Sequence, residues 1–471
     1  PLTRPRARLL RIIWIGFSLL AAEGVRAQDC QTPVATVLSV QGTVELQRAG
    51  AADWVPAELN NALCNGDTVR VQRRSRASVQ LDGASTLRIA AGSQMTFEGA
   101  NDEGRQIVDM LKGAAHILSR SGDGRLDVKT PFAVAGVRGT EFLVSADDRQ
   151  AEVIVFEGIV LARNDQGSER LTGGRSVLAR AGEGPVVRQV LRPRDEVQWA
   201  LYYPPVMLPD PGTLPDQNDL RQKVETASDA YLRGDAGAAL DTLEGVDEDG
   251  IDDPRFFAFQ ASLLLALGSV DEAVSAVDRA LALEPGQSDA LALQSIVALT
   301  QNDSAKALDL AQRAVASQPE SATALLALSY AQQAQFDLRS ARSSVEQATR
   351  SEPRNALAWA RLAELEASSG RLDRALEAAR EAAEIAPKLS RTQTVLGFAQ
   401  LSRVEIDAAK TSFEKAIGFD AADPLPRLGL GLARIREGHL SEGGREIEAA
   451  ASLDPSSSLI RSYLGKTYFE V

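Results

Sequence analysis

The histidines and cysteines are the residues best suited to catalysis or metal binding, and their spacing supports neither. The chain has only two of each, with His116 inside a predicted strand and His439 after Gly438 in a predicted turn. Zinc sites need about three or four clustered ligands, so we expect no metal site. The sequence also lacks a glycine-rich phosphate loop and a Gly-x-Ser-x-Gly nucleophile elbow. We therefore predict that the protein is not an enzyme and takes no cofactor.

Acidic residues cluster between 247 and 253, at Asp247, Glu248, Asp249, Asp252 and Asp253. Their spacing does not match the oxygen ligands of a calcium-binding loop, so we interpret them as a solvated loop. The formal net charge is -13, and most of the excess acid lies after residue 204. Because an acidic surface repels phosphate groups, we expect no nucleic-acid partner.

Residues 1–27 have the pattern of a signal peptide. Arginines come first, an apolar stretch follows from 12 to 22, and Ala27 precedes a cleavage point before Gln28. The alternative is a short membrane anchor, although the apolar stretch is shorter than the roughly 20 residues that span a bilayer. We expect export to the periplasm or cell envelope, with no transmembrane helix in the mature chain.

Because we expect export, we predict a disulfide between Cys30 and Cys64, since a lone cysteine pair outside the cytoplasm commonly forms one. The bridge would tie the mature N-terminus to the first strands and stabilise the fold by roughly 3 kcal/mol in the chain-entropy model. The alternative is two buried thiols.

Residues 28–203 have the pattern of an all-β domain, either a sandwich or a short β-solenoid. Ala77, Val79 and Leu81 alternate with polar residues, as in a strand with one apolar face. Similar short runs are separated by turn residues, at 36–40, 43–46, 68–71, 86–89, 116–118, 141–144, 152–156 and 159–162.

Four stretches of this region carry a family resemblance: LDGASTLRI (81–89), LKGAAHI (111–117), LDVKTPFAVAGVRGTEFLV (126–144) and VFEGIVLA (155–162). From about 36 to 182 the chain resembles the FecR family, the sensing domain of periplasmic sigma-factor regulators. Those regulators have a cytoplasmic sigma-binding segment and a membrane helix ahead of this domain. A predicted signal peptide stands there instead, so we expect no transmembrane sigma control by this chain alone.

Glycines in these stretches have structural reasons to be there. Gly136 and Gly139 flank Arg138 at a predicted bend, and Gly158 lies between two predicted strands. A missing Cβ permits a positive φ or a close backbone approach, so we predict structural glycines. Arg138 is either a turn arginine or a partner contact.

Prolines concentrate in residues 204–219, which we predict to be an extended linker. Trp199, Tyr202 and Tyr203 come just before it. They are either an apolar patch that fixes the junction between domains or a platform that stacks against polysaccharide.

From 220 to 471 the sequence repeats with a period of 34 residues. A proline returns at 285, 319, 353, 387 and 455, and an alanine stands five residues before each of these positions and before Ala421. A fixed period of this length indicates stacked helix pairs. We predict about seven repeats and a half repeat. Because such arrays end in polar caps, we expect the chain to continue beyond 471 or a partner to cover that end.

We number each unit so that its proline is position 32, which makes the full units begin at 254, 288, 322, 356, 390 and 424. Each unit then has small residues at positions 8 and 20 and a proline or its equivalent after the second helix. This pattern resembles the tetratricopeptide repeat (TPR) family. That resemblance implies a right-handed superhelix whose concave groove binds a protein or peptide. Position 9 of each unit would face the groove, which singles out Ile296, Tyr330, Glu364, Phe398 and Leu432. An apolar helix or extended segment would suit this groove, and the alternative is that these residues pack internally.

Two functions remain open. The first is a non-enzymatic scaffold of the bacterial cell envelope whose TPR groove binds a partner protein, within an envelope complex or near polysaccharide. The second is a periplasmic sensor that relays a stimulus from the FecR-like domain to a membrane regulator.

Overall fold

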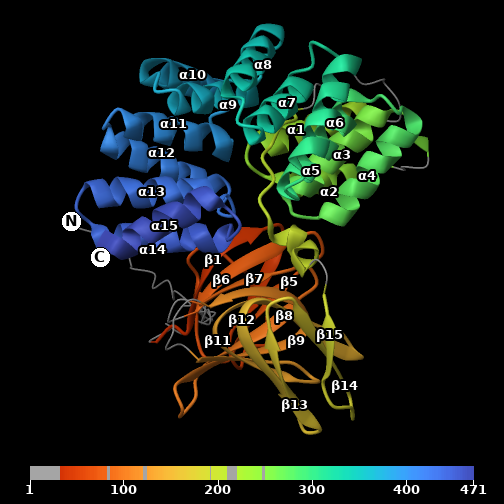
Figure 1. Ribbon diagram of the computed structural model, residues 1–471, viewed down its shortest axis with the longest axis vertical. Helices are drawn as coiled ribbons and strands as arrows, with labels where there is room; N and C mark the ends of the chain where they lie inside the picture. The colour runs from red at the N-terminus through yellow and green to blue at the C-terminus, as the bar shows by residue number, and fades with distance from the viewer. Residues whose placement is uncertain are drawn as a thin grey trace, which may run out of the picture.

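The computed structural model describes residues 32–81, 85–119, 125–190, 193–208, 220–244, 246 and 250–470. The predicted signal peptide, Cys30 and most of the predicted linker lie outside the described residues. The described chain consists of β-strands, one 3-10 helix and then α-helices, so the fold is a multidomain β plus α architecture (Figure 1).

The β-domain comes first. Its strands are β1 (Ala35–Gln41), β2 (Val44–Gln47), β3 (Val55–Pro56), β4 (Ala62–Leu63), β5 (Asp67–Val71), β6 (Arg76–Leu81), β7 (Ser85–Ile89), β8 (Gln94–Ala100), β9 (Arg105–Ser119), β10 (Arg125–Lys129), β11 (Val134–Ala146), β12 (Gln150–Asn164), β13 (Gly167–Thr172), β14 (Arg175–Arg180) and β15 (Val186–Gln189).

These strands form one hydrogen-bonded network. Its main path is β15-β14-β12-β11-β10-β9-β7-β6-β1-β4, and a second arm of β3, β2, β5 and β8 joins it at the long strand β9. The pairings are antiparallel except β9 with β10, which favours the sandwich alternative over a solenoid of parallel coils. The two arms enclose a single apolar core that includes Leu87, Phe97, Ile117 and Phe142, all fully buried.

The sheet is buried on its polar face as well. Ser78 pairs with Arg88, and Arg88 with His116, so these residues form a row across β6, β7 and β9. All three are at most 6% exposed. Side chains of β6 therefore point alternately into the apolar core and toward the polar face of the sheet. Other parts of the protein cover that polar face.

Two predicted glycines meet in the β11–β12 pair. Gly139 has φ +64° and Gly158 has φ +89°, at a register shift between the strands. A Cβ on Gly158 would lie 2.6 Å from the carbonyl oxygen of Gly139. Gly136 has no positive φ, and a Cβ there would lie 3.1 Å from Asp127 Oδ1. The predicted bend is thus a bulge inside one continuous strand.

Fifteen helices follow in the described part of the chain. They are α1 (Leu220–Leu232), α2 (Ala236–Glu244), α3 (Pro254–Ala266), α4 (Val270–Leu283), α5 (Ser288–Thr300), α6 (Ser304–Ser317), α7 (Ala322–Ala334), α8 (Leu338–Ser351), α9 (Ala356–Ser368), α10 (Leu372–Ile385), α11 (Ser390–Ser402), α12 (Ile406–Phe419), α13 (Pro424–Arg436), α14 (Leu440–Leu453) and α15 (Ser458–Glu470). Consecutive helices pack as pairs, from α1 with α2 to α13 with α14.

Residues that recur with the 34-residue period shape each helix pair and the turns around it. The repeated alanines, for example Ala280, Ala348 and Ala416, are completely buried where the two helices cross. Each proline of the period lies in the short segment between pairs, where it cannot continue the helix. The turn within each pair has one residue with positive φ, and these residues are Gly234, Gly268, Asn302, Phe336, Gly370, Val404 and Gly438. At Val404 this conformation costs roughly 1–2 kcal/mol.

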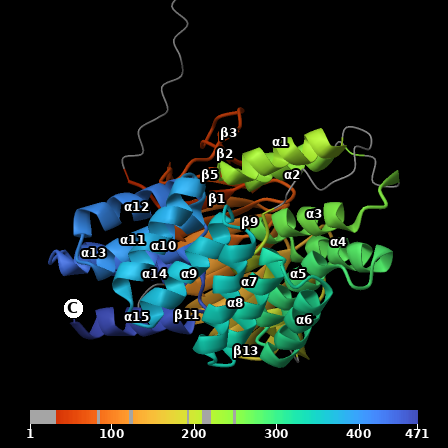
Figure 2. The ribbon, with the colours of Figure 1, turned by 90° about the horizontal axis from the view of Figure 1, so that it is seen from above.

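The array curls over the β-domain and nearly closes into a ring (Figures 1 and 2). A Cβ on Gly234, between α1 and α2, would lie 3.1 Å from the carbonyl oxygen of Lys388, just before α11. The first pair therefore touches the sixth across the concave side, and Figure 2 shows strands of the β-domain beneath the opening.

The predicted junction patch connects the two parts. Trp199, in the 3-10 helix η1 (Pro193–Ala200), packs with Leu143 and Ile154 of the sheet. Tyr203 is 4% exposed and belongs to the core of the first repeats. These contacts confirm the interpretation that the aromatic residues fix the junction.

Candidate functional site

The concave side of the array holds a tip of the β-domain through buried polar contacts. Leu38 lies in β1 where the register with β6 shifts between Val37 and Ser39. Such a bulge leaves backbone groups free of ladder pairing, and the Leu38 carbonyl accepts a hydrogen bond of 3.0 Å from Nη2 of Arg427 in α13. Arg427 is 6% exposed, and its Nη1 pairs with Glu446 at 3.0 Å. The β-domain therefore supplies an acceptor to a buried arginine of the array.

A second contact joins the end of β1 to the segment between α12 and α13. Gln41 Nε2 donates to Asp420 Oδ1 over 2.8 Å, and Gln41 Oε1 accepts from Nε of the buried Arg76. Arg76 Nη1 also donates to the carbonyl oxygens of Trp199 and Leu201, at 2.9 and 3.1 Å. One arginine thus holds the strand end and the chain that leaves the β-domain.

Apolar and surface contacts complete this interface. Leu59 of the β-domain packs in the cluster that contains Phe398, Ile406 and Leu432 of the array. At the opposite end of the array, Arg74 forms ion pairs with Glu244 of α2 and, at 2.6 Å, with Glu272 of α4. Surface pairs of this kind contribute about 0–1 kcal/mol each, so the buried contacts dominate.

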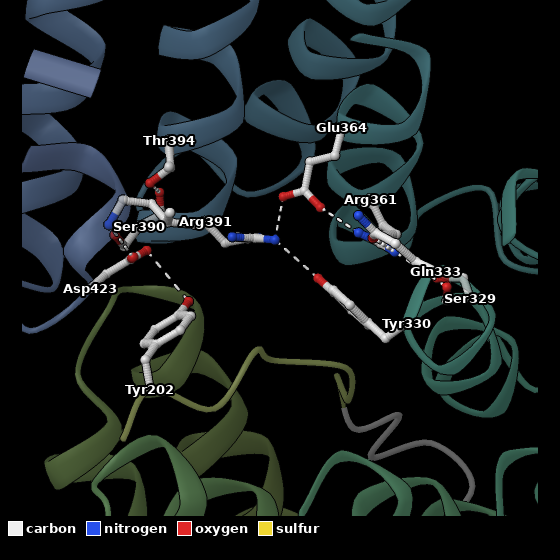
Figure 3. A network of polar contacts seen from close by, with 11 residues as sticks. Tyr202, Ser329, Tyr330, Gln333, Arg361, Glu364, Ser390, Arg391, Thr394 and Asp423 are labelled. Carbon is white, nitrogen blue, oxygen red and sulfur yellow. Dashed lines mark hydrogen bonds and ion pairs between the residues drawn. The ribbon is translucent and has the colours of Figure 1, made fainter. Parts of the chain in front are cut away.

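A polar network occupies the middle of the concave face (Figure 3). Arg361 stacks on Tyr330, with its Cζ 3.8 Å from the ring centre, and its Nη1 pairs with Glu364 at 3.0 Å. Arg391 Nη2 donates to the Tyr330 hydroxyl over 3.0 Å and pairs with the other oxygen of Glu364. Arg361 also donates to Ser329 and Gln333. One carboxylate therefore balances two buried arginines.

The chain from the β-domain reaches this network at Tyr202. Its hydroxyl donates to Asp423 Oδ2 at 3.4 Å, while Oδ1 of Asp423 caps helix α13 by accepting from Leu425 N. Burial raises the pKa of Asp423 to about 7, and the nearby Arg391 guanidinium opposes this shift. Burial also raises the pKa of Asp420, and the charge of Arg76 opposes that rise. The junction therefore contains two carboxyl groups that are costly to ionise.

The predicted groove residues fall in three environments. Ile296 is 1% exposed and belongs to the repeat core. Tyr330 and Glu364 belong to the polar network. Phe398, Leu432 and the β-domain residue Leu59 pack against the same buried cluster, and the ring of Phe398 packs edge-on against Phe413 at a centroid distance of 4.9 Å. The fold thus gives each of them contacts within this chain, and their role in binding another protein stays a prediction.

Sequence reasoning missed the arginines of this site. Arg361 occupies the sixth position of its unit, where the other full units have Phe259, Leu293, Ala327, Val395 and Gly429. Arg427 occupies a fourth position, held elsewhere by Phe257, Leu291, Leu325, Trp359, Gln393 and Arg461. At the sixth position, which is otherwise apolar or small in the full units, the charge of Arg361 was the available signal, whereas the fourth position has mixed residue types and gave no signal for Arg427. Arg391, at a second position with mixed residue types, had no such signal.

A cavity of about 270 Å³ lies beside the network, between the β-domain, the linker and the array. Its charged lining residues are Asp235, Arg391 and Asp420. The rest of the wall is largely apolar and includes Val40, Tyr202, Tyr203, Pro204, Pro205, Val206, Met207, Tyr231, Leu265, Leu293, Leu389 and Phe419.

The remaining expectations concern metal ligands, the cysteine pair and membrane-spanning helices. Among the described residues no three His, Cys, Asp or Glu side chains are grouped to hold a metal ion. His116 instead contacts the buried Glu141 at 3.2 Å. Because Cys30 lies outside the described residues, the Cys30–Cys64 disulfide stays a prediction. In the described part of the chain, every helix is too short or too polar to cross a membrane.

Family comparisons agree with this architecture. The model described as FecR protein matches residues 67–161, within β5 to β12. The tetratricopeptide repeat model matches residues 260–322 and 325–390, which hold α4 to α6, α8 to α10, all but two residues of α7 and the second half of α3. The chain contains a FecR domain and tetratricopeptide repeats. Both predicted resemblances are thereby confirmed, and the pairs α1–α2, α11–α12 and α13–α14 extend the TPR array beyond the matched residues.

Solved structures are similar to parts of the chain. A TPR protein of Thermus thermophilus is 19% identical, with 39% of this chain and 99% of that chain covered at a TM-score of 0.35. One of Parabacteroides merdae is 14% identical, covering 52% and 98% at a TM-score of 0.36. A proposed anti-sigma factor of Parabacteroides distasonis is 21% identical, covering 29% and 66% at a TM-score of 0.26. Comparison with curated proteins gave no match.

Proposed function

We propose that this protein is a non-enzymatic binding protein of the bacterial cell envelope, in which the TPR array holds the FecR domain as an internal partner and the two together bind another protein. One observation carries the proposal: the β-domain tip lies on the concave face and bonds to its buried side chains, as Arg427 does to Leu38. Of the proposed partner-binding residues, Phe398 and Leu432 pack against the same cluster as Leu59 of the β-domain, whereas Tyr330 and Glu364 contact arginines of the array.

The location in the envelope rests on sequence and family. The predicted signal peptide and the FecR match both favour an exported protein. TPR arrays are binding scaffolds whose concave surfaces take up other chains.

A photocrosslinking amino acid at Phe398 in the full-length protein tests the internal partner. We expect a crosslink within the chain, to the segment around Leu59, because the two side chains share an apolar cluster. The matched control is the same amino acid at Phe336, a phenylalanine of the array that is 93% exposed and should give no crosslink to the β-domain. A crosslink from position 398 to another protein, with none to the β-domain, would contradict the proposal.

Signalling is the second candidate, because the FecR domain is joined to the array by the bonds of Gln41 and Arg76. A stimulus that moves the β-domain would alter those bonds. Crosslinked partners from an envelope fraction separate the two functions. A scaffold should yield components of an outer-membrane or secretion complex, whereas a sensor should yield an inner-membrane regulator.

A further inference from the structure

Residues 420–423, between α12 and α13, form a seat on which the β-domain and the chain that leaves it rest. Asp420 is partly buried and accepts a hydrogen bond of 2.8 Å from Gln41 of β1. Asp423 is 1% exposed and accepts a hydrogen bond of 3.4 Å from the hydroxyl of Tyr202, just after the β-domain (Figure 3). Two carboxyl groups three residues apart therefore contact both the β-domain and its exit chain.

The seat differs in sequence from the equivalent segments of the other repeats. Between 285 and 455 the 34-residue period lacks its proline only at Ala421. Ala421 is 8% exposed and belongs to the apolar cluster against which Leu59 of the β-domain packs. A proline ring at this position would add bulk to that cluster. The missing proline thus coincides with the place where the array receives the β-domain.

The described hydrogen bonds of both carboxyl groups come from uncharged donors. Besides Gln41 and Tyr202, the donors are the backbone N–H of Ala422, to Asp420, and that of Leu425, to Asp423. A buried carboxylate without a paired cation is costly, and a second carboxylate nearby adds repulsion. The docked arrangement therefore disfavours the state in which both carboxyl groups are ionised.

Two arginines face the seat, and their guanidinium groups are bonded to other acceptors. These are Arg391, which faces Asp423, and Arg76, which faces Asp420. Burial raises the pKa of Asp423 to about 7 and also raises the pKa of Asp420, although both arginines oppose these shifts. The other titratable groups around the seat, on the elements packed against it, are Tyr202, Tyr203, Tyr231, Tyr330 and Glu364.

We propose that the seat is a pH-dependent latch, which holds the β-domain while one of its two carboxyl groups is protonated and releases it when both are ionised. Release would admit water to Asp420 and Asp423 and would uncover the concave face around Phe398 and Leu432. This regulation rests on the proposed function, because the face that opens is the one assigned to another protein. The Tyr202 hydroxyl can bond to either form of Asp423, since it both donates and accepts, so opening follows from charge.

Docking should weaken as pH rises. A carboxyl group whose pKa is higher in the docked than in the open state favours docking below its open-state pKa. This contribution is lost as pH rises through the docked value, which is about 7 for Asp423. The β-domain tip is therefore expected to be held more firmly at pH 5.5 than at pH 8.

Amide hydrogen exchange in residues 38–42 of the full-length protein tests the latch. Wild type and Asp423→Asn are compared at the same pH, so that the intrinsic exchange rate cancels. The ratio of the wild-type rate to the variant rate should be at least about tenfold larger at pH 8 than at pH 5.5. Low concentrations of guanidinium should change these rates little, because local opening exposes little surface.

Asp407→Asn is the matched control. Asp407 lies in the neighbouring helix α12, its side chain is 94% exposed, and it pairs with Lys410 at 3.1 Å. For this variant the ratio of rates should be the same at both pH values within about twofold, as expected for a surface substitution.

A ratio for Asp423→Asn that is the same at pH 5.5 and pH 8 overturns the latch, as does an equal change in Asp407→Asn. Exchange in residues 38–42 that accelerates steeply with guanidinium also overturns it, because the pH effect then belongs to unfolding of the whole protein. The crosslink at position 398 is measured at pH 5.5, where the tip is docked. A failed latch and a failed internal partner therefore give different results.

Discussion

At the residue scale, this protein is distinguished by arginines buried inside its array and where the array meets the β-domain. Arg76, Arg361, Arg391 and Arg427 are each at most 7% exposed. A buried ion is tolerated only with excellent pairing, and removing one member of such a pair costs about 3–5 kcal/mol. Each arginine here reaches an acceptor on a different segment, so the charges fix which segments meet.

The buried carboxyl of Asp423 predicts a pH dependence. Its pKa is raised to about 7, chiefly by burial, and it faces Tyr202, Arg391 and Asp420. A carboxyl whose pKa is higher in the folded than in the unfolded state stabilises the fold below the unfolded pKa, and this contribution is lost as pH rises to the folded pKa. The free energy of unfolding of the wild type should therefore fall by about 2–4 kcal/mol between pH 5 and pH 8 because of this group.

Asp423→Asn should remove this loss, because asparagine keeps an oxygen that can cap helix α13 and carries no charge at any pH. The measurement is the free energy of unfolding from denaturant titrations of both proteins at several pH values. The difference between them should change in favour of the variant as pH rises from 5 to 8. Parallel curves would show that Asp423 does not titrate in this range.

At the scale of elements, the array is held together by small residues that accept large neighbours. Phe413 of α12 is completely buried between α11 and α13. A Cβ on Gly397 would lie 2.6 Å from its ring, and a Cβ on Gly429 would lie 2.2 Å from it. Both glycines are therefore needed for close helix packing, although glycine weakens a helix interior by about 1 kcal/mol relative to alanine.

Gly429→Ala should destabilise the protein by about 1–3 kcal/mol, because the added methyl group overpacks the Phe413 site. Gly418→Ala in α12 is the matched control, since nothing lies within 4 Å of a Cβ there. That change should be neutral or stabilising by up to about 1 kcal/mol. Denaturant unfolding of the two variants checks the prediction, and equal effects at both positions would refute the packing argument.

At the scale of the whole molecule, the ring-like array and the β-domain form one body. Contacts at Leu38, Gln41 and Leu59 lie on one side of the ring, and Arg74 with its two glutamates lies on the other. The concave face of the array is thus occupied by its own chain in the region of these contacts. A protein partner that used the same face would have to displace the β-domain tip.

Arg427→Gln should loosen this docking, because it removes the hydrogen bond to Leu38 and the ion pair with Glu446. We expect amide hydrogen exchange in residues 38–42 to become about tenfold faster, equivalent to one lost charge-assisted hydrogen bond. Exchange in β8 and β9 should stay unchanged.

Arg434→Gln is the control for Arg427→Gln, since Arg434 lies in the same helix and also pairs with Glu446, at 3.3 Å. Equal exchange in the two variants would show that the bond to Leu38 does not hold the domain.

The sequence by itself determined the two families, the strand runs and the helix pairs, because local periodicity encodes them. Alternation places Ala77, Val79 and Leu81 on one face, and a 34-residue period places Ala280 and its equivalents at each helix crossing. The junction role of Trp199 and Tyr203 was also readable, since exposed aromatic residues beside a linker need a surface to cover them.

Only the tertiary structure decided what the concave face contacts. Leu38 and Arg427, or Tyr202 and Asp423, are far apart in the chain, and no local pattern relates them. Their meeting depends on how far the array curls, which is a sum of small rotations between repeats, and on where the linker leaves the sheet. Phe398 and Leu432, which were predicted to bind a partner, therefore carry no local mark of the cluster that they share with Leu59.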